Sequence, residues 1–305
     1  MIRKIIFVSF SGRNAGEHYC NPSLYYNFPI RSERISFSKF FNHANIERGN
    51  LYIIGGGGLL DTNTNSNRVF MSLPDKNKYV LWGAGTNRLI LDNVNWVYGD
   101  DEINPEIDQL SNFTLVGRRD FNMDGLQYDY VPCASCKIEE LRMERPIRRR
   151  IGILDHVTFH NSPLTYERMN MDLKLYSINN ILEFIASSKV IVTSSYHGMY
   201  WATLMKKKVI VGIDWSTKFH YFKYPPVLFS GDIEKDIKEC KIYPESLEES
   251  IQANDNFYNK ILEKVKQEGT HKSPLGIGKG YRAMRHRPPP FREYLKFKEK
   301  IWSFQ

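Results

Sequence analysis

Short runs of apolar residues, rich in β-branched and aromatic side chains, recur along the chain and predict the buried strands of parallel β-sheets. Most of these runs end in glycine, hydroxyl or charged residues, which favour tight turns. The runs are Ile5–Phe10, Leu51–Ile54, Tyr79–Trp82, Phe113–Gly117, Ile151–Leu154, Val190–Val192 and Val209–Val211. Helical patterns lie between several of them, so the fold class that we expect is α/β.

The segment on either side of position 190 has the clearest pattern. Asn179 and Asn180 are suited to cap a helix over 181–186, whose apolar residues fall on one face. The strand Val190–Val192 follows, then a turn, and then a second helix, Met199–Met205, with three lysines after it. Helix, strand, turn, helix and strand in this order predict consecutive units of a parallel sheet.

The turn after that strand contains His197, preceded by Ser194 and Ser195. Ligands of open α/β sheets bind at the carboxyl ends of strands, beside helix N-termini. We therefore expect His197 to take part in proton transfer to a bound anion, with Ser194 and Ser195 in contact with the substrate. A histidine that only caps the turn by hydrogen bonding is an equally open interpretation.

The two halves of the chain share this order of strand, turn and helix, which predicts two Rossmann-like domains facing each other across a cleft. A charged run, Arg142–Arg150, contains Pro146 and is typical of an interdomain linker. The predicted N-terminal domain covers residues 1–145 and the C-terminal domain residues 146–270. Residues 271–305 are expected to form a basic linker and a terminal helix.

Glycines follow two predicted strands of the first half, as Gly55–Gly58 and as Gly83-Ala84-Gly85. Without a Cβ, such turns let backbone N–H groups approach an anion or a sugar, so Gly56, Gly57 and Gly85 are candidate substrate-binding residues. Tight packing of a helix on the sheet would use glycines equally well. Neither run completes a P-loop or a dinucleotide pattern, which disfavours nucleotide hydrolysis and NAD chemistry.

Cationic side chains stand at further strand ends. Arg118 and Arg119 precede Asp120, and two guanidinium groups can clamp a phosphate or a carboxylate. The alternative is a surface pair in which one arginine bridges to Asp120. His156 is a candidate to line the site or to serve its local turn, and Lys218 is a candidate anion ligand or a solvated lysine.

Composition limits the classes of protein. The 305 residues are 42% hydrophobic, and no apolar stretch approaches the roughly 20 residues that span a bilayer. The N-terminal apolar run is short and lacks a cleavage site, so we expect a cytoplasmic protein. Cys133 and Cys136 have the spacing of zinc or redox sites, but no second pair completes such a site, which favours structural cysteines at a domain junction.

The net charge of +8 is concentrated at the C-terminus, where residues 271–305 hold nine Lys and Arg against two Glu. The rest of the chain is nearly neutral, which argues against a nucleic-acid partner. The basic and aromatic segment 291–302 suits an anionic membrane surface, at which the protein would be peripheral, or a diphosphate-bearing substrate. A solvated terminal helix that packs its aromatic residues on the body is an equally open interpretation.

Five segments, taken in order, carry a family resemblance. The most specific is Thr193-Ser194-Ser195-Tyr196-His197-Gly198, and the others are Gly55–Leu59, Leu81–Gly85, Val116–Asp120 and Val131–Cys136. Together they resemble the polysaccharide pyruvyl transferase family, including its exopolysaccharide-assembly members. The resemblance runs from Ile53 to Lys218, and it leaves out residues 1–34 and the basic tail.

This resemblance implies a GT-B-like fold and a reaction in which phosphoenolpyruvate donates pyruvate to two hydroxyls of a sugar. The product would be a pyruvate ketal on a cell-surface or exopolysaccharide precursor, with a lipid diphosphate as one option for its carrier. Arg119 matches the family's donor-binding arginine and His197 its essential histidine. As imidazolium, His197 would protonate the enol-ether carbon, while Arg119, with Arg118 and Lys218, would hold the phosphate and carboxylate. No cofactor or metal is implied.

Two other functions stay open at this point. One is a GT-B-type glycosyltransferase with a nucleotide-sugar donor, in which His197 would be a base or a diphosphate ligand. The other is a sugar-binding or assembly protein without catalysis.

Overall fold

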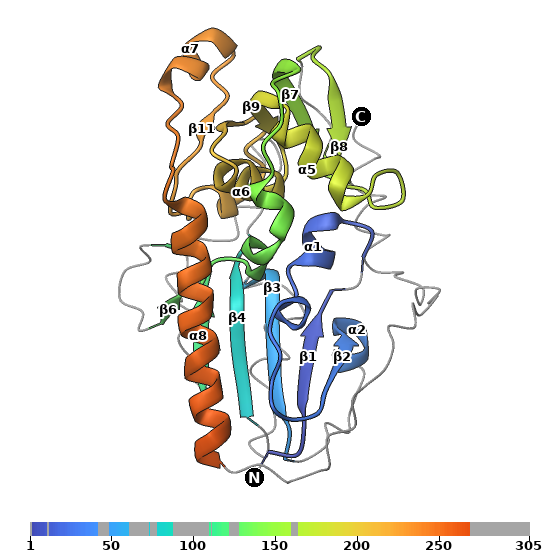
Figure 1. Cartoon of the computed structure of the whole chain (residues 1–305), viewed down its shortest axis with the longest axis vertical. Coiled ribbons are helices and arrows are strands. Elements are labelled where there is room, and N and C mark those ends of the chain that lie inside the picture. Colours follow the sequence, from blue (N-terminus) through green and yellow to red (C-terminus); the bar gives the residue numbers. More distant parts are fainter. Residues whose placement is uncertain are drawn as a thin grey trace, which may run out of the picture. The chain divides into compact units, whose positions relative to one another are not determined.

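The computed structural model describes residues 2–10, 12–41, 49–60, 73, 78–87, 110, 112–121, 128–159 and 164–268. Within them the chain forms two parallel β-sheets (Figure 1). The first has the strand order β2 (Ser32–Ser36), β1 (Ile5–Ser9), β3 (Leu51–Leu60), β4 (Lys78–Thr86), β5 (Leu115–Arg118) and β6 (Asp129–Tyr130). The second has the order β11 (Val227–Leu228), β10 (Lys208–Val211), β9 (Ser188–Thr193), β7 (Arg149–Asp155) and β8 (Arg168–Asn170). The expected α/β class with two Rossmann-like parallel sheets is confirmed.

Each apolar run that predicts a strand coincides with a strand of one of these sheets. The strands that the pattern does not predict are β2, β6, β8 and β11, which are the edge strands of the two described sheets. Edge strands are short and face solvent, so they do not need the continuous apolar runs of buried parallel strands.

The glycine runs continue β3 and β4 instead of ending them, so the predicted glycine turns are wrong. Gly56 and Gly57 have φ angles of 75° and 96°, which side chains other than glycine rarely adopt. A Cβ on Gly56 would lie 2.2 Å from the Cys20 sulfur. The glycines therefore let the strand change direction and pack closely on a neighbouring segment without ending its ladder.

Helices α5 (Ile178–Ala186) and α6 (Tyr196–Leu204) flank β9, as the pattern predicts, but their starts differ from the prediction. Ser177 caps α5, and its hydroxyl and Asn180 form a reciprocal capping box. Ser195 caps α6, whose first turn therefore contains His197. Every residue of α6 is buried, so the helix has no amphipathic stripe from which its start could be read.

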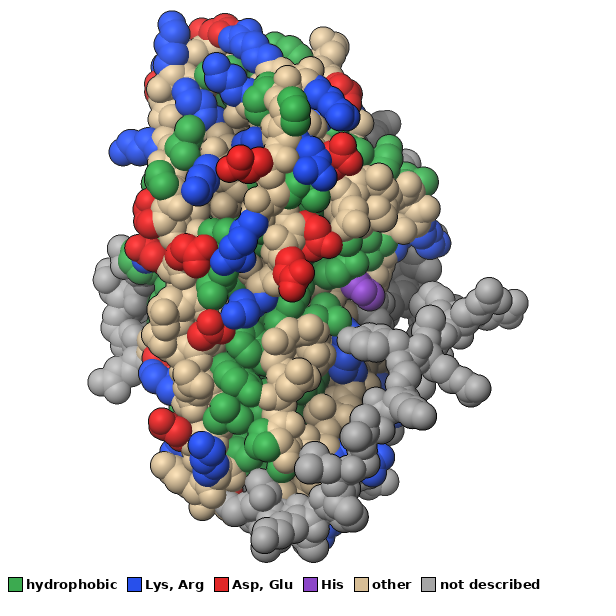
Figure 2. Space-filling view, in the orientation of Figure 1, with side chains coloured by type: hydrophobic (Ala, Val, Ile, Leu, Met, Phe, Trp, Pro, Cys, Tyr) green, Lys and Arg blue, Asp and Glu red, His purple; other side chains and the backbone are tan. Residues whose placement is uncertain are grey.

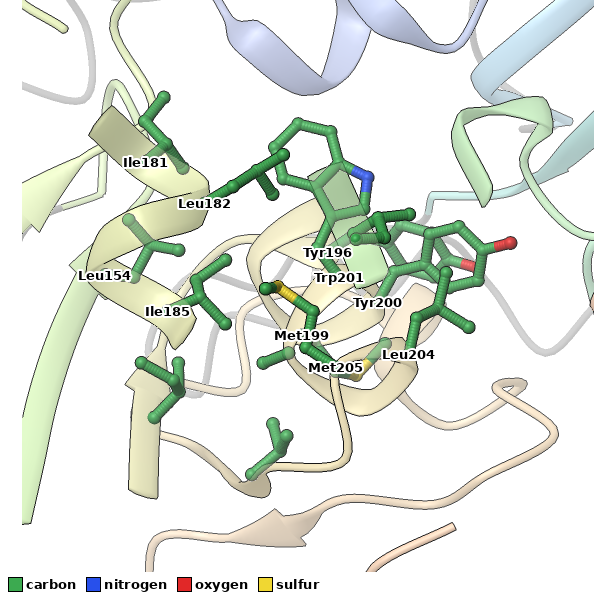
Figure 3. Packing of buried hydrophobic residues seen from close by; sticks show 14 of the residues in the cluster. Leu154, Ile181, Leu182, Ile185, Tyr196, Met199, Tyr200, Trp201, Leu204 and Met205 are labelled. Atoms are coloured by element: carbon green, nitrogen blue, oxygen red, sulfur yellow. The ribbon is translucent and has the colours of Figure 1, made fainter. Parts of the chain in front are cut away.

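The buried faces of α5 and α6 meet in one apolar cluster. Figure 3 shows Ile181, Leu182 and Ile185 of α5 turned toward Met199 and Trp201 of α6. The α5 residues are fully buried, and each such side chain contributes about 1.5–3 kcal/mol relative to an exposed one. This packing fixes α6, and with it the backbone of the segment that carries His197.

Helix α8 (Ser246–Glu268) returns the chain to the first sheet (Figure 1). Its residues Phe257, Ile261 and Val265 share an apolar cluster with Trp82 of β4, and the Trp82 indole donates to Asn254 over 2.8 Å. The helix belongs to the predicted C-terminal domain by sequence position, but its buried face belongs to the first sheet. The domain boundaries stay predictions, and the predicted terminal helix in 271–305 lies outside the described residues.

The shorter helices are α1 (Ala15–Tyr19), α2 (Phe37–Phe41) and α7 (Ile233–Glu239). On the face in Figure 2, Lys and Arg side chains lie among Asp and Glu side chains without forming a patch of one sign. Exposed pairs such as Arg142–Glu248 contribute about 0–1 kcal/mol each. Among the described helices, none combines the length and hydropathy needed to span a bilayer.

Candidate active site

His197 lies in the first turn of α6, directly after the carboxyl end of β9. The helix begins there because the Ser195 hydroxyl accepts from the Gly198 N–H over 3.3 Å. The imidazole is 6% exposed, and its Nε2 lies 3.3 Å from the sulfur of Cys133. Its other face meets α1, because a Cβ on Gly16 would lie only 2.1 Å from Nδ1. The predicted strand-end position of His197 is thus confirmed, although the residue is helical.

Arg119 directly follows β5 and is 2% exposed. Its guanidinium carbon lies 3.8 Å from the centre of the Tyr196 ring, a cation–π contact that leaves the N–H groups at the rim free to donate. The Nε atom is buried without a hydrogen-bond partner. Within the described part of the chain no carboxylate pairs with this guanidinium. Its buried positive charge therefore lacks a counter-charge there, which is costly in free energy.

Arg118 is also buried, but it is neutralised inside the protein. Its Nη2 lies 2.8 Å from Asp120, whose carboxylate also accepts from the N–H and hydroxyl of Thr86. The bridge to Asp120, the second interpretation of the sequence, is the correct one, although the pair is buried instead of exposed. Gly85 makes room for Asp120 and Arg119, since a Cβ there would lie 2.4 Å from Asp120 Oδ1 and 2.6 Å from Arg119 Nε.

Lys218 lies in the 3₁₀ turn Thr217–Phe219, after β10, and is 7% exposed. Its ammonium nitrogen lies 3.4 Å from the centre of the Trp215 ring. Burial and the charge of Arg119 lower the pKa of Lys218 well below its usual value, and Glu17 partly opposes this shift. The alternative of a solvated lysine is wrong, because the Lys218 side chain is buried.

The hydroxyls of Ser194 and Ser195, which the sequence predicts to contact the substrate, have hydrogen-bond partners within the fold. Ser194 Oγ donates to the carbonyl of Phe159 over 2.7 Å and accepts from the N–H of His156 over 2.9 Å. The His156 ring is partly exposed, and its Nε2 lies 3.2 Å from the amide of Asn14. Ser194 and Ser195 therefore shape the site through the backbone, while His156 lies near enough to His197 to lower its pKa.

Three residues of the site escape the sequence-based prediction, namely Gly16, Glu17 and Cys133. Gly16 and Glu17 lie on α1, whose first residue, Ala15, donates to the Met171 carbonyl of the second half over 2.8 Å. Burial raises the pKa of Glu17, and Lys218 partly opposes it. No local motif marks these α1 residues, whereas the C-x-x-C motif marks Cys133 without indicating its contact with His197.

The electrostatics of the site oppose a protonated histidine while the site holds no anion. Burial, then Arg119, Lys218 and His156, lower the pKa of His197 well below 6.5. A neutral ring is the resting form at pH 7. The sequence-based expectation of a pKa near neutrality therefore does not hold for the free protein, and an anion beside Arg119 and Lys218 would raise the pKa again. Among the described residues, no group of three His, Cys, Asp or Glu has the arrangement to hold a metal ion.

Comparison with known families agrees with this site. Residues 131–217 match the model of the family described as polysaccharide pyruvyl transferase, and they include Cys133 and His197. The family resemblance is confirmed. The protein is a transferase that modifies a saccharide. Arg119 and the α1 residues precede the matched segment, so their place in the site comes from the structure.

Known proteins add little beyond the family. No curated protein matches the sequence. Among solved structures, a functionally uncharacterized protein from Klebsiella pneumoniae subsp. pneumoniae is 15% identical, with a TM-score of 0.39 over 68% of this chain and 82% of that one. The wall teichoic acid polymerase TagF is 11% identical, with a TM-score of 0.41 over 87% of this chain and 90% of that one. The likeness is loose, and we infer nothing about substrates from it.

Proposed function

We propose that the protein uses phosphoenolpyruvate to form a pyruvate ketal on a sugar of a cell-surface or exopolysaccharide precursor. The observation that supports this best is the buried Arg119, which has no anionic partner in the described structure and lies within electrostatic reach of His197 and Lys218. Phosphoenolpyruvate carries a phosphate and a carboxylate, and both are natural partners for Arg and Lys. In this proposal Arg119 binds the donor and Lys218 assists it.

The reaction needs one proton on carbon and two hydroxyl attacks. Protonation of the methylene carbon of phosphoenolpyruvate creates a cationic centre at the neighbouring carbon, which one sugar hydroxyl attacks with loss of its proton. The C–O bond to phosphate then breaks, inorganic phosphate leaves with a proton, and the second hydroxyl attacks and loses its proton. The products are the ketal and phosphate. We assign the first proton to His197, since a positioned general acid contributes about 10²–10⁴-fold.

The donor would supply the conditions for its own protonation. In the free site Arg119 and Lys218 hold the pKa of His197 down. Bound phosphate and carboxylate groups would offset both charges, raise the pKa and allow the ring to become imidazolium. The proton would then be available mainly when the donor is bound. In the empty site His197 would stay neutral beside the charges of Arg119 and Lys218.

The test is release of phosphate from phosphoenolpyruvate by the full-length protein, with and without a panel of nucleotide-linked and lipid-linked sugars. We expect release that depends on an acceptor and is lost in His197→Ala and Arg119→Ala, while Arg142→Ala, at an exposed pair, keeps it. No release with any acceptor, together with thermal stabilisation by UDP or GDP, would support a nucleotide-sugar glycosyltransferase instead.

Membrane contact of residues 291–302, outside the described structure, is a separate part of the proposal. A basic, aromatic segment would hold the protein at an anionic surface where lipid-linked precursors are made. Deletion of 291–302 should abolish sedimentation with anionic liposomes and leave phosphate release with a soluble acceptor intact. Equal sedimentation of the deleted and full-length chains would remove this part.

A further inference from the structure

A chain of polar side chains runs from α6 to the 3₁₀ turn Ala134–Lys137 and back to the catalytic histidine. The indole Nε1 of Trp201 lies 2.9 Å from Ser135 Oγ. Ser135 Oγ lies 3.1 Å from the sulfur of Cys133, which lies 3.3 Å from His197 Nε2. All four residues are buried. Trp201 and His197, the first and last of these residues, both lie on α6, four positions apart. The hydrogen bonds therefore connect the imidazole back to its own helix and fix its position.

Trp201 sets the direction of the hydrogen bonds. An indole N–H only donates, so Ser135 Oγ is the acceptor of that bond. The Ser135 hydroxyl proton then has the Cys133 sulfur as its acceptor. Sulfur can accept more than one hydrogen bond and an imidazole N–H is a stronger donor than a thiol, so Nε2–H of His197 donates to the same sulfur. If the Cys133 thiol donated to Ser135 instead, the Ser135 hydroxyl would be buried with its proton unsatisfied, which costs free energy.

We propose that the Cys133 sulfur accepts from Nε2–H of His197 and so holds the neutral ring in the tautomer protonated at Nε2. Nδ1 is then the nitrogen without a proton, which can take one up and pass it to the substrate. Nδ1 has no hydrogen-bond partner among the described residues, and it faces Gly16, where an added Cβ would lie 2.1 Å away. Cys133 is a positioning residue, since it acts through His197.

Two further contacts support this role. The Tyr200 hydroxyl donates to the Cys133 carbonyl over 2.9 Å and fixes its backbone against α6. Burial raises the pKa of the Cys133 thiol, so the sulfur keeps its proton. When His197 takes up a proton at Nδ1, the bond from Nε2–H to the sulfur persists, because the sulfur of a thiol is an acceptor. Cys133 therefore stays in contact with the ring in both charge states.

Cys136 is a matched control on the same turn. It is as deeply buried as Cys133, but its sulfur lies near the Ala134 carbonyl and the Asn254 amide, at 3.9 Å and 3.5 Å. No described contact joins it to His197. A change at Cys136 reports the cost of altering a buried thiol without altering the tautomer.

The test is the tautomeric state of His197 in the full-length, ligand-free protein, read from nitrogen–proton correlation spectra with ¹⁵N-labelled histidine. His197→Gln assigns the signals by their loss. We expect the wild type and Cys136→Ala to show a protonated Nε2 and an unprotonated Nδ1. Cys133→Ala should lose this preference, because its Nε2–H would be buried without an acceptor, and Cys133→Ser should retain it. A wild-type ring protonated at Nδ1, or a Cys133→Ala spectrum equal to the wild type, would overturn the proposal.

A second readout rests on the proposed function. Cys133→Ala should lower kcat by about 10-fold to 100-fold, the range seen when the partner that orients a functional histidine is removed, with KM for phosphoenolpyruvate unchanged. Cys136→Ala should remain near the wild type. If the protein transfers no pyruvyl group, this readout fails in the wild type too, while the spectra still decide the tautomer. The two failures are therefore distinguishable.

Discussion

Arg118 and Arg119 are neighbours in the chain and both are buried, yet the protein treats their charges in opposite ways. Arg118 is paired with Asp120, and that carboxylate is satisfied further by Thr86. Arg119 stacks on Tyr196 and has no acidic partner in the described structure.

The contrast separates a charge that the fold neutralises from one that we propose binds the donor. Burying a charge is costly unless it is paired, so the Arg118 cluster has the features of a built element of the fold. Arg119 and Lys218 are buried without full charge compensation, which costs free energy of folding. A bound anionic donor would offset that cost. Substitutions at the two clusters should therefore have opposite effects on stability and on donor binding.

The largest effect should come from breaking the paired cluster. Asp120→Asn leaves the buried Arg118 guanidinium without its counter-charge, and we expect a loss of about 3–5 kcal/mol in the free energy of unfolding. Denaturant unfolding measures it. Asp129→Asn, which breaks an exposed pair with Lys260, is the control and should cost less than about 1 kcal/mol. Equal effects of the two changes would show that Arg118 and Asp120 are not a structural pair.

The second effect concerns the unpaired cluster. Arg119→Met removes a buried charge that has no partner, so the ligand-free protein should be as stable as the wild type or more stable. Its Kd for phosphoenolpyruvate should rise by about 100-fold or more, because a buried charged contact contributes about 2–5 kcal/mol. Thermal unfolding with and without phosphoenolpyruvate measures both quantities. A variant that is destabilised when free but keeps the donor response would reverse the comparison.

Gly16 tests how closely α1 approaches the histidine. Because an added Cβ would lie 2.1 Å from Nδ1, Gly16→Ala should push the ring out of place, cost about 1–3 kcal/mol of stability and lower phosphate release while donor binding persists. The same change in a His197→Ala background should cost much less, since the clashing ring is gone. Equal costs in the two backgrounds would place the clash elsewhere.

The smallest effect is a proton count. The pKa of free His197 lies well below 6.5 because of burial, Arg119, Lys218 and His156, so donor binding should be accompanied by uptake of up to one proton. The facing Cys133 thiol stays neutral, and the carboxyl of Glu17 has a raised pKa. As the pH rises through the pKa of the donor-bound histidine, the uptake and the affinity should both fall.

Calorimetry in buffers with different ionisation enthalpies gives the number of protons. His197→Gln is the control, because it removes the histidine and keeps the titration of the donor's own phosphate. The lowered pKa also predicts that the ligand-free protein loses stability as the pH falls below about 6.5, where the unfolded histidine binds a proton that the folded one does not. Equal uptake by wild type and variant would contradict the role assigned to His197.

Local patterns predicted the parts of this picture that depend on neighbours in the chain. The buried strands and the strand-end position of His197 follow from apolar runs and from the hydroxyl residues that come after Val192. The difference between Arg118 and Arg119 does not, because it depends on Thr86, which is distant in the sequence. The contact between Cys133 and His197 likewise joins residues 64 positions apart. Such pairings are products of the tertiary fold and leave no periodic signal.

The glycine runs also depend on contacts that the sequence pattern does not reveal. A glycine run predicts a turn when only the freedom of its backbone is considered. In the fold, Gly56 allows the approach of Cys20 and Gly85 that of Asp120 and Arg119, while strands β3 and β4 continue past them. The return of α8 to the first sheet is equally invisible from its amphipathic pattern, which indicates a buried face without naming its partner.

The most direct test of the central claim follows the two halves of the donor separately. Phosphoenolpyruvate labelled with ¹⁴C in its carbon chain and with ³²P in its phosphate is incubated with the full-length protein and a saccharide acceptor. The account predicts that ¹⁴C enters the saccharide while ³²P is released as inorganic phosphate, in equal amounts, and that Arg119→Met does neither. A saccharide without ¹⁴C, for every acceptor that the protein binds, would contradict it.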